Sequence, residues 1–530
     1  MPERNSRHLE TMKYTSLLLM ALAIASIAQS QCDCPPIGDR PVVNVASGGS
    51  GTTTWTCANT YVLEGYVFVQ AGQVLTIEAG TVIKGAAGSG VDAAALIVSR
   101  DGQIYAEGNA ECPIIMTYEA DPLDGSISYD TRGQWGGLIV LGNATTNFGG
   151  VAQVEGIPAD NDQASYGGDN DADNSGVLRY VSVRHGGAEL GAANEINGIT
   201  FAAVGSATIV ENVEVVSNLD DGIEFFGGAV SVKNAVVAFC GDDSFDWDQG
   251  YHGQMNENWL AIQDQPGGIG DRGAELDGDD SDDGNVSPDE LPLATPTVVG
   301  WTIVGVGGGQ GMLFRNGSGG HVSNGVIANV AEGIEIEDKE TPMDAFDHWV
   351  NGDLTLSNIT VLGDDALDYD GDEVEDGDAQ LDAYAADNGV VVNNNLEVDY
   401  LFAFNSGGTT ATDTLNLECG SGSGHAWALG WTFCDAINLF GGAGTVNSVG
   451  DVSTVSLTVW PNPAASANVR VSGLTAGAQL EVRDVLGHVV WRGKATGETA
   501  VLPVAGLSSG TYLLNYNEAG IIGRQRFIIQ

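Results

Sequence analysis

Basic residues are scarce in this chain. Its 530 residues include 19 Lys and Arg against 71 Asp and Glu, so the formal net charge is −52. A field of that sign repels phosphate backbones, which argues against nucleic-acid binding. It favours calcium, cationic partners and salt-rich surroundings instead.

Two further absences exclude other kinds of protein. No C-x-x-C pair occurs, which argues against a zinc site. No apolar run approaches the roughly 18 residues of a membrane-spanning helix. The apolar run that does exist, Ser16 to Ala28, follows Lys13 and precedes the small residues Ala28-Gln29-Ser30. This pattern predicts a secretory signal peptide within residues 1–30 and therefore export.

Glycine is abundant, with 75 residues and no G-x-y period, which favours a turn-dense β protein. A short sequence pattern recurs in two groups along the middle of the chain, with spacings of 22 to 33 residues within each group. Its copies begin at the following residues: Ile199, Ile223, Phe245, Met312, Ile334 and Leu367. A second line, about ten residues earlier, places asparagine at one position. These asparagines are Asn212, Asn234, Asn258, Asn324 and Asn358.

Repeats of this length, with apolar and polar residues alternating, are typical of a parallel β-helix. Stacked coils pair their backbones and share one core, and the asparagines are expected to form a ladder at a corner. The fold class predicted is all-β: a right-handed parallel β-helix over residues 61–450, followed by a small antiparallel β-sandwich domain. Residues 31–60 are expected to form a disulfide-bearing cap.

The cysteines suit an exported protein, in which disulfides are permitted. Cys32, Cys34, Cys57 and Cys112 form an N-terminal set whose pairing the spacing leaves open. Cys419 and Cys434 are close in sequence and are expected to pair with each other. Cys240, in the apolar segment VVAFC, is expected to be a buried free thiol.

Residues 455–530 differ in composition, with six basic and four acidic residues. Three landmarks follow in order: Trp460-Pro461-Asn462-Pro463, Asp484 to Gly487, and Leu507 to Tyr512. With these motifs the segment resembles the C-terminal sorting domain of type IX secretion cargo in Bacteroidetes-like bacteria. The resemblance implies recognition by the type IX secretion machinery, then release or attachment to outer-membrane lipopolysaccharide. It therefore implies a secreted or cell-surface location.

The lines at residues 55–85 and 133–144 resemble exported β-helix surface proteins of the same bacteria. That family implies a fold and little about activity. Parity along the first repeated line places Ile223 and Phe225 inside and Glu224 outside. The same parity predicts an acidic stripe on one outer face, interrupted by Leu313 and Arg315. Its other members are Asp246, Asp248, Glu335, Glu337, Asp368 and Asp370. A solvated face that serves solubility is the alternative interpretation of this stripe.

One insertion follows the twelve-residue pattern of a calcium loop, with glycine at its sixth position and glutamate at its twelfth. The candidate ligands are Asp279, Ser281, Asp283, Asn285, Ser287 and Glu290. Calcium is therefore the predicted cofactor, held by a lone loop because no amphipathic helix precedes it. A solvated acidic loop is the alternative.

A catalytic hypothesis rests on Asp220-Asp221, Asp242-Asp243, His252 and Arg315, whose order loosely resembles the series of polygalacturonase-type glycoside hydrolases. The resemblance implies Asp242 or Asp243 as general acid, and Asp221 with its neighbour as base for inversion. His252 and Arg315 would bind substrate. The Asn-Thr before the first Asp and the Lys after the Arg are absent, so no residue is assigned as catalytic. A lyase is favoured even less.

Three readings of function follow. The first is a surface-displayed, adhesin-like protein that binds an extracellular polysaccharide or a neighbouring cell with calcium. The second is the glycoside hydrolase, and the third is a passive coat protein. Trp349 is the aromatic residue predicted to be exposed for glycan stacking. Trp247 is expected in the core, and Trp259 and Trp301 are ambiguous.

Overall fold

The computed structural model describes most of the chain from Cys34 to Ile529. The described ranges are 34–124, 126–158, 161–189, 195–263, 269–279, 291–339, 343–362, 366–371, 374–393, 398–399, 414–415, 426–436, 458–460, 468–472, 474–475, 477–484, 489–504, 507, 510–518 and 521–529. The predicted signal peptide in residues 1–30 lies outside them.

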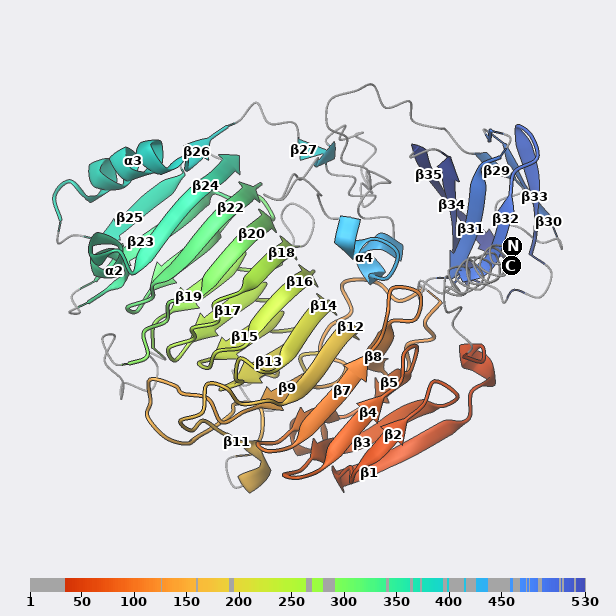
Figure 1. Cartoon of the computed structure of the whole chain (residues 1–530), viewed down its shortest axis with the longest axis horizontal. Helices are drawn as coiled ribbons and strands as arrows, with labels where there is room; N and C mark the ends of the chain where they lie inside the picture. Colours follow the sequence, from red (N-terminus) through yellow and green to blue (C-terminus); the bar gives the residue numbers. More distant parts are fainter. Residues whose placement is uncertain are drawn as a thin grey trace, which may run out of the picture.

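Parallel strands form one continuous sheet that winds through the large N-terminal part of the chain (Figure 1). Its strands are β1 (Val42–Gly49), β2 (Thr53–Trp55), β3 (Thr60–Val69), β4 (Val74–Ile77), β5 (Val82–Gly85), β6 (Ala95–Val98), β7 (Gln103–Glu107), β8 (Ile114–Tyr118), β9 (Leu138–Leu141), β12 (Gly176–Arg184), β13 (Ile199–Ala202), β14 (Ile209–Val216), β15 (Ile223–Phe226), β16 (Ser231–Ala238), β17 (Phe245–Asp248), β18 (Asn256–Ile262), β19 (Ala274–Asp277), β20 (Thr297–Val304), β21 (Gln310–Arg315), β22 (Gly320–Ala328), β23 (Glu332–Asp338), β24 (Leu354–Leu362), β25 (Leu367–Gly371) and β26 (Val391–Val392).

Register divides these strands into three faces. The first face stacks β2, β4, β7 and the first half of β12. The second face stacks the first parts of β1 and β3, then β5, β8 and the second half of β12. The third face stacks β6, β9, β13, β15 and β17, and continues to β25. From β12 onward one bent strand supplies the first two faces of each coil, as in β14 and β16. The predicted parallel β-helix is therefore present.

The bend between the first two faces carries part of the predicted asparagine ladder, which Gly300 interrupts before Asn324 and Asn358. Asn212, Asn234 and Asn258 all have φ near +58°, the left-handed conformation that asparagine tolerates better than most residues. The amide of Asn234 donates to Asn212 Oδ1 at 3.1 Å, and that of Asn258 donates to Asn234 Oδ1 at 2.9 Å. Gly300 takes the same place in β20, with φ +82°. These hydrogen bonds keep the corners of the three successive coils in register.

Inward side chains build a continuous core along the coils. Its middle is aromatic: Trp259 stacks on Phe245 at 4.6 Å between ring centroids and meets Trp301 edge-on at 4.9 Å. Trp247, Trp259 and Trp301 are fully buried, which confirms the expectation for Trp247 and settles the two ambiguous positions.

Disulfide Cys34–Cys57 staples the first coil and resolves part of the N-terminal cysteine set. Within residues 31–60, β1 and β2 already pair in parallel with the following coil. Cys240 is a buried free thiol, as predicted. Cys434 is also a buried free thiol, so the expected Cys419–Cys434 bridge is wrong. Cys434 is held in an apolar cluster on the outside of the second face.

Helices, which the all-β prediction did not include, occur near the last coils. The helices are α2 (Ala345–Asn351), α3 (Gly377–Asn388) and, further along, α4 (Phe433–Ala436). Short 3-10 turns complete the described helical segments: η1 (Ile37–Asp39), η2 (Gly90–Asp92), η3 (Asp162–Ala164) and η4 (Ala426–Ala428). Trp349 in α2 is partly buried against the core, with Tyr384 at 5.5 Å and Phe346 at 5.0 Å. Its prediction as the exposed aromatic is wrong because α2 turns this side chain toward α3.

The C-terminal segment forms two antiparallel sheets, of order β29-β30-β33 and β32-β31-β34-β35. Small antiparallel pairs β10-β11 and β27-β28 lie outside them. The remaining strands are β10 (Ala152–Gln153), β11 (Ser165–Tyr166), β27 (Val398–Asp399), β28 (Thr414–Leu415), β29 (Thr458–Trp460), β30 (Asn468–Ser472), β31 (Gln479–Asp484), β32 (Val489–Lys494), β33 (Thr499–Pro503), β34 (Gly510–Glu518) and β35 (Ile521–Ile529). Side chains from both larger sheets, among them Val471 and Phe527, share one core.

Candidate functional site

Acidic side chains stack in register on the outside of the third face. Each strand there is short and alternates, so Ile223 and Phe225 enter the core while Glu224 points outward. The register places five carboxylates in one line, interrupted by Leu313. This carboxylate row consists of Glu224, Asp246, Glu275, Glu335 and Asp368. The predicted parity and the interruption at Leu313 are confirmed.

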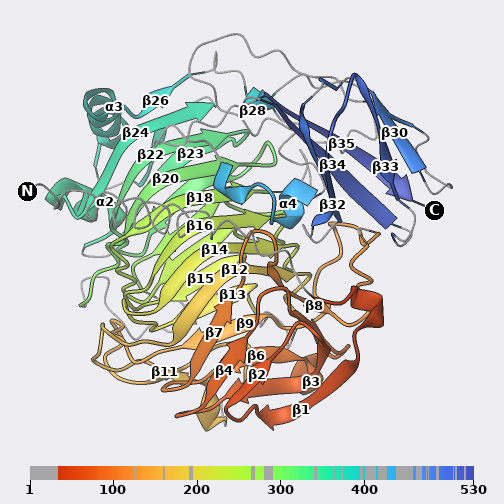
Figure 2. The same cartoon turned by 45° about the vertical axis from the view of Figure 1, so that its right-hand side comes forward.

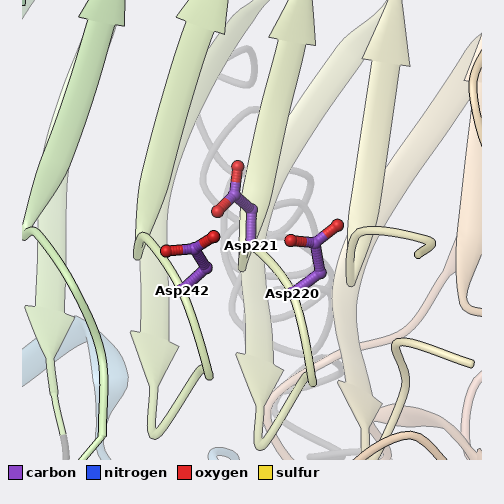
Figure 3. A group of neighbouring side chains, drawn as sticks. All are labelled: Asp220, Asp221 and Asp242. Atoms are coloured by element: carbon purple, nitrogen blue, oxygen red, sulfur yellow. The ribbon is translucent and has the colours of Figure 1, made fainter. Parts of the chain in front are cut away.

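The turns that precede these strands add a second line of acids. Asp220 and Asp221 precede β15, Asp242 and Asp243 precede β17, and Asp271 precedes β19. Oxygen atoms of Asp220, Asp221 and Asp242 lie within 4.8 Å of one another. Figure 3 shows their carboxylates gathered at two neighbouring turns. We call these five residues the turn acids.

The two lines meet in compact groups. One oxygen atom from each of Asp221, Glu224 and Asp246 lies within 4.8 Å of the others, and Asp243, Asp246 and Glu275 do the same. Asp221 and Glu224 are only 7% and 8% exposed. The solvated-face interpretation therefore does not describe this part of the stripe. A loop contributes to the cover, since Asn197 donates to both Glu155 at 3.1 Å and Glu224.

Burial and mutual repulsion raise the pKa values of these carboxyls. The largest cause for Asp221, Glu224, Asp243 and Asp246 is desolvation, followed by neighbouring acids, and all four pKa values lie well above their ordinary range. The same causes raise the pKa of Asp220 to about 7. Burial and repulsion therefore favour the protonated forms of these carboxyls, and a bound cation would favour the charged forms instead.

Two arginines offset part of this charge. Arg272 contacts Glu275 at 2.8 Å and Asp243 at 3.6 Å. Arg315 contacts Asp277 at 2.8 Å and Glu275 at 3.1 Å. Neither arginine forms an ion pair with Asp221, Glu224 or Asp246 among the described residues. The arginines therefore form their ion pairs at one end of the site, with Asp243, Glu275 and Asp277.

A second group lies further along the same face. Oxygen atoms of Glu332, Glu335 and Asp368 are within 4.8 Å of one another, and Gln310 donates to Glu335 at 3.1 Å. Burial is the first cause of the raised pKa of Glu335. Leu313 separates this group from the turn acids, so the third face carries two acidic centres.

The structure gathers some of the residues singled out by sequence and separates others. Asp220, Asp221, Asp242, Asp243 and Arg315 share the third face. His252 does not, because it follows β17 while Asp242 and Asp243 precede it. The His252 ring contacts Asp171 instead, at 3.5 Å. The polygalacturonase-like constellation is therefore not assembled.

The predicted calcium loop falls largely outside the described residues. Asp279, its first ligand, is described and buried. Ser281, Asp283, Asn285, Ser287 and Glu290 lie outside them. The loop follows β19, the strand that contributes Glu275 and Asp277 to the third face.

Sequence reasoning missed Asp271, Arg272, Glu275 and Asp277. Their strand, Ala274-Glu275-Leu276-Asp277, has the repeated pattern, but the spacing from Phe245 to its register partner Ala274 exceeds the 22 to 24 residues of the neighbouring repeats. A search that allowed an insertion before the strand would have found it.

The fold and this face define an all-β protein built on a parallel β-helix with an acidic outer face. Residues 48–432 match the model of the pectate-lyase-like β-helix domain, and the chain belongs to that family. Residues 458–530 match the secretion-system C-terminal sorting domain, which confirms the resemblance drawn from the motifs. That domain indicates export to the cell surface or the medium.

Comparison with individual proteins adds little. No curated protein matches the chain. One similar solved structure is PorZ, described as an essential bacterial surface component of the type IX secretion system of Porphyromonas gingivalis. The two share 20% identity over 14% of this chain and 11% of PorZ, with a TM-score of 0.14. Within the described part of the chain, no helix has the length and apolarity needed to cross a membrane.

Proposed function

We propose that this protein binds an extracellular polymer or cell surface in an adhesin-like manner, and that calcium on its third face assists the binding. One observation carries the proposal: Asp221, Glu224 and Asp246 converge within 4.8 Å, with the first two buried and Asp246 partly exposed. Calcium takes six to eight oxygen ligands, and carboxylates are its usual protein ligands. A bound calcium ion would replace the protons that the raised pKa values otherwise require.

Calcium would also reduce the electrostatic repulsion between this acidic chain and an acidic polymer. A chain of net charge −52 repels acidic polysaccharides. A cation held on the third face would present its free coordination positions to polymer hydroxyls or carboxylates. The repeated acids along the coils would allow a long polymer several points of attachment, and linked weak contacts raise overall affinity.

We propose a second calcium position in the loop predicted from sequence, at Asp279, Ser281, Asp283, Asn285, Ser287 and Glu290. Its support is the spacing of oxygen ligands and its place directly after β19. The loop would bind calcium beside the third face.

For export, we propose four functional segments: a signal peptide in residues 1–30, a cap in 31–60, the β-helix in 61–450 and a sorting domain in 455–530. The shared core of the two C-terminal sheets supports their packing as a sandwich. This domain would engage the type IX secretion machinery and allow attachment to lipopolysaccharide.

The test uses the purified full chain with calcium, with magnesium and with chelator. Titration calorimetry would measure calcium binding, and sedimentation with insoluble polysaccharides would measure retention. Asp221→Asn with Glu224→Gln should weaken calcium binding at least tenfold and abolish calcium-dependent retention. Asp382→Asn, a change at an exposed acid on α3, is the matched control. Retention that is unchanged by chelator and by the double substitution would contradict the proposal. If the chain bound neither calcium nor any polysaccharide, the coat-protein interpretation would be favoured.

A glycoside hydrolase is the second candidate, favoured by one observation. Asp220, with its pKa raised to about 7, lies within 4.8 Å of Asp242. A protonated carboxyl beside an ionisable one is what acid–base catalysis requires. The oxygens lie closer than the ~6.5–9.5 Å of inverting pairs, which argues against the inversion expected from sequence. New reducing ends that disappear in Asp242→Asn would establish this candidate.

A further inference from the structure

A short segment near the end of the β-helix part lies on the outside of the second face. Residues 426–436, which include η4 and α4, pass over β14, β16 and β18 (Figure 2). They come just before the residues that lead to the sorting domain. We call this segment the strap.

The surface beneath the strap changes character from coil to coil. Its first outward row reads Ser182, Glu214, Val236 and Leu260 in register. Its second outward row reads Arg184, Val216, Ala238 and Ile262. The first coil is thus polar at both positions, the second carries Glu214 beside Val216, and the next two are apolar. All eight side chains are buried, although they point away from the core.

The polar end receives the backbone of the strap. The carboxylate of Glu214 accepts the N–H of Phe433 at 2.9 Å and that of Cys434 at 3.1 Å. Ser182 donates to the same carboxylate at 2.6 Å. Glu214 is fully buried, so these donors replace water around its charge. Without the strap, two of these three donors would be lost.

The side chains of the strap complete the fit. The Arg184 guanidinium lies 5.0 Å from the centre of the Phe433 ring, within the range of a cation–π contact. Trp431 meets Tyr180 edge-on at 5.3 Å. Ala428, Phe433 and Cys434 pack with Val216, Val236, Ala238 and Leu260 in one apolar cluster. Burial there is the first cause of the raised pKa of Cys434.

The strap also holds its own shape. Thr432 donates to Ala428 O at 2.7 Å, and its hydroxyl accepts the N–H of Asp435 at 3.0 Å. The N–H of Gly430 bonds to Asp435 Oδ2 at 2.7 Å. The strap adds no strand to the parallel sheet, so no backbone ladder fastens it to the β-helix. A compact unit held in this way can leave and rebind as a tethered ligand does.

We propose that residues 426–436 are a releasable strap, and that the outer surface of β12 to β18 is a docking site for an aromatic-bearing helical turn. The strap occupies this site in the same chain. Release uncovers the apolar side chains of the two outward rows.

The thiol of Cys434 makes release measurable. It is a free thiol within the strap, whereas Cys240 is a free thiol in the core. Burial protects both thiols from a thiol reagent. Mass spectrometry of the labelled full chain measures the labelling rate of each cysteine separately. In the native chain Cys434 should label at least tenfold faster than Cys240. Phe433→Ala and Glu214→Gln should each accelerate Cys434 labelling tenfold or more and leave Cys240 unchanged. Glu257→Gln, at a partly exposed acid on β18, should change neither rate.

A free peptide of sequence 426–436, with Ser in place of Cys434, tests the docking site on the unaltered protein. An excess of this peptide should compete with the strap and accelerate Cys434 labelling. Equal labelling rates for Cys434 and Cys240 in the native chain would overturn release, because the strap would then open only with global unfolding. No effect of the peptide would overturn the docking site.

Discussion

Glu224 and Asp246 occupy the same register position on adjacent coils, and oxygen atoms of their carboxylates lie within 4.8 Å of each other and of Asp221. The backbone pairing that stacks the coils therefore also forces these like charges together. Proteins keep such an arrangement at a cost in free energy, which protons or a cation can relieve.

The metal-free chain should become more stable as pH falls from 8 to 5. Asp220 and Asp277 have folded pKa values of about 7 against an ordinary value of 3.8. Between pH 3.8 and about pH 7 the folded state therefore binds more protons than the unfolded state. The stability that these protons contribute is lost as pH rises through about 7. Thermal melting in chelator should show Tm higher by several degrees at pH 5 than at pH 8. Calcium should flatten this slope, and a slope that calcium leaves unchanged would contradict its binding here.

Removing an arginine from the site should destabilise the chain and enlarge the effect of calcium. Arg272→Met leaves the buried Asp243 without a cation and leaves Glu275 with Arg315 alone, and breaking a buried ion pair costs about 3 kcal/mol or more. The metal-free Tm should fall most at pH 8, and added calcium should recover most of the loss. Arg179→Met is the control, because its partners Glu107 and Glu211 are half-exposed and such pairs contribute less than about 1 kcal/mol. A similar loss in both variants would argue against a special charge balance at Arg272.

The fold and the line of the carboxylate row could be predicted from sequence because a strand has a period of two. Once Ile223 and Phe225 are assigned to the core, Glu224 must face outward, and stacking repeats this for Asp246 and Glu335. The cover over the row could not be predicted in this way. It comes from Glu155 and Asn197 in other coils, and contacts between distant segments leave no local pattern.

The strap shows the same limit. Residues 426–436 follow a glycine- and serine-rich stretch and lack the repeat, so nothing local indicates that Glu214, far earlier in the chain, receives them. The error at Cys434 has this origin, since closeness in sequence to Cys419 suggested a bridge where the fold buries a thiol. The error at Trp349 is similar, because its contacts with Phe346 and Tyr384 bury part of the side chain and leave no local pattern in the sequence.

The aromatic centre of the core should tolerate shape-preserving change better than truncation. Trp259 stacks on Phe245 and Phe225 with interplanar angles of 5°, and its indole N–H donates to Val232 O at 3.0 Å. Trp259→Ala should lower the free energy of unfolding by about 3–5 kcal/mol, as large cavities do. Trp259→Phe should cost less because it keeps the stacking. Chemical denaturation would measure both, and equal losses would show that the N–H bond matters more than packing.

The asparagine ladder should depend on conformation as well as on hydrogen bonds. Asn234 has φ +59°, donates to Asn212 and accepts from Asn258, so Asn234→Ala loses two amide contacts and adds strain. Strain of about 1–2 kcal/mol and about 1 kcal/mol for each bond predict a loss of about 3–4 kcal/mol. Asn234→Gly removes the same bonds without the strain, as Gly300 already does in β20, and should lose about 2 kcal/mol. Denaturant unfolding of the two variants separates the contributions. Equal stability of the alanine and glycine variants would show that the left-handed corner costs nothing and that the amide ladder alone holds the coils in register.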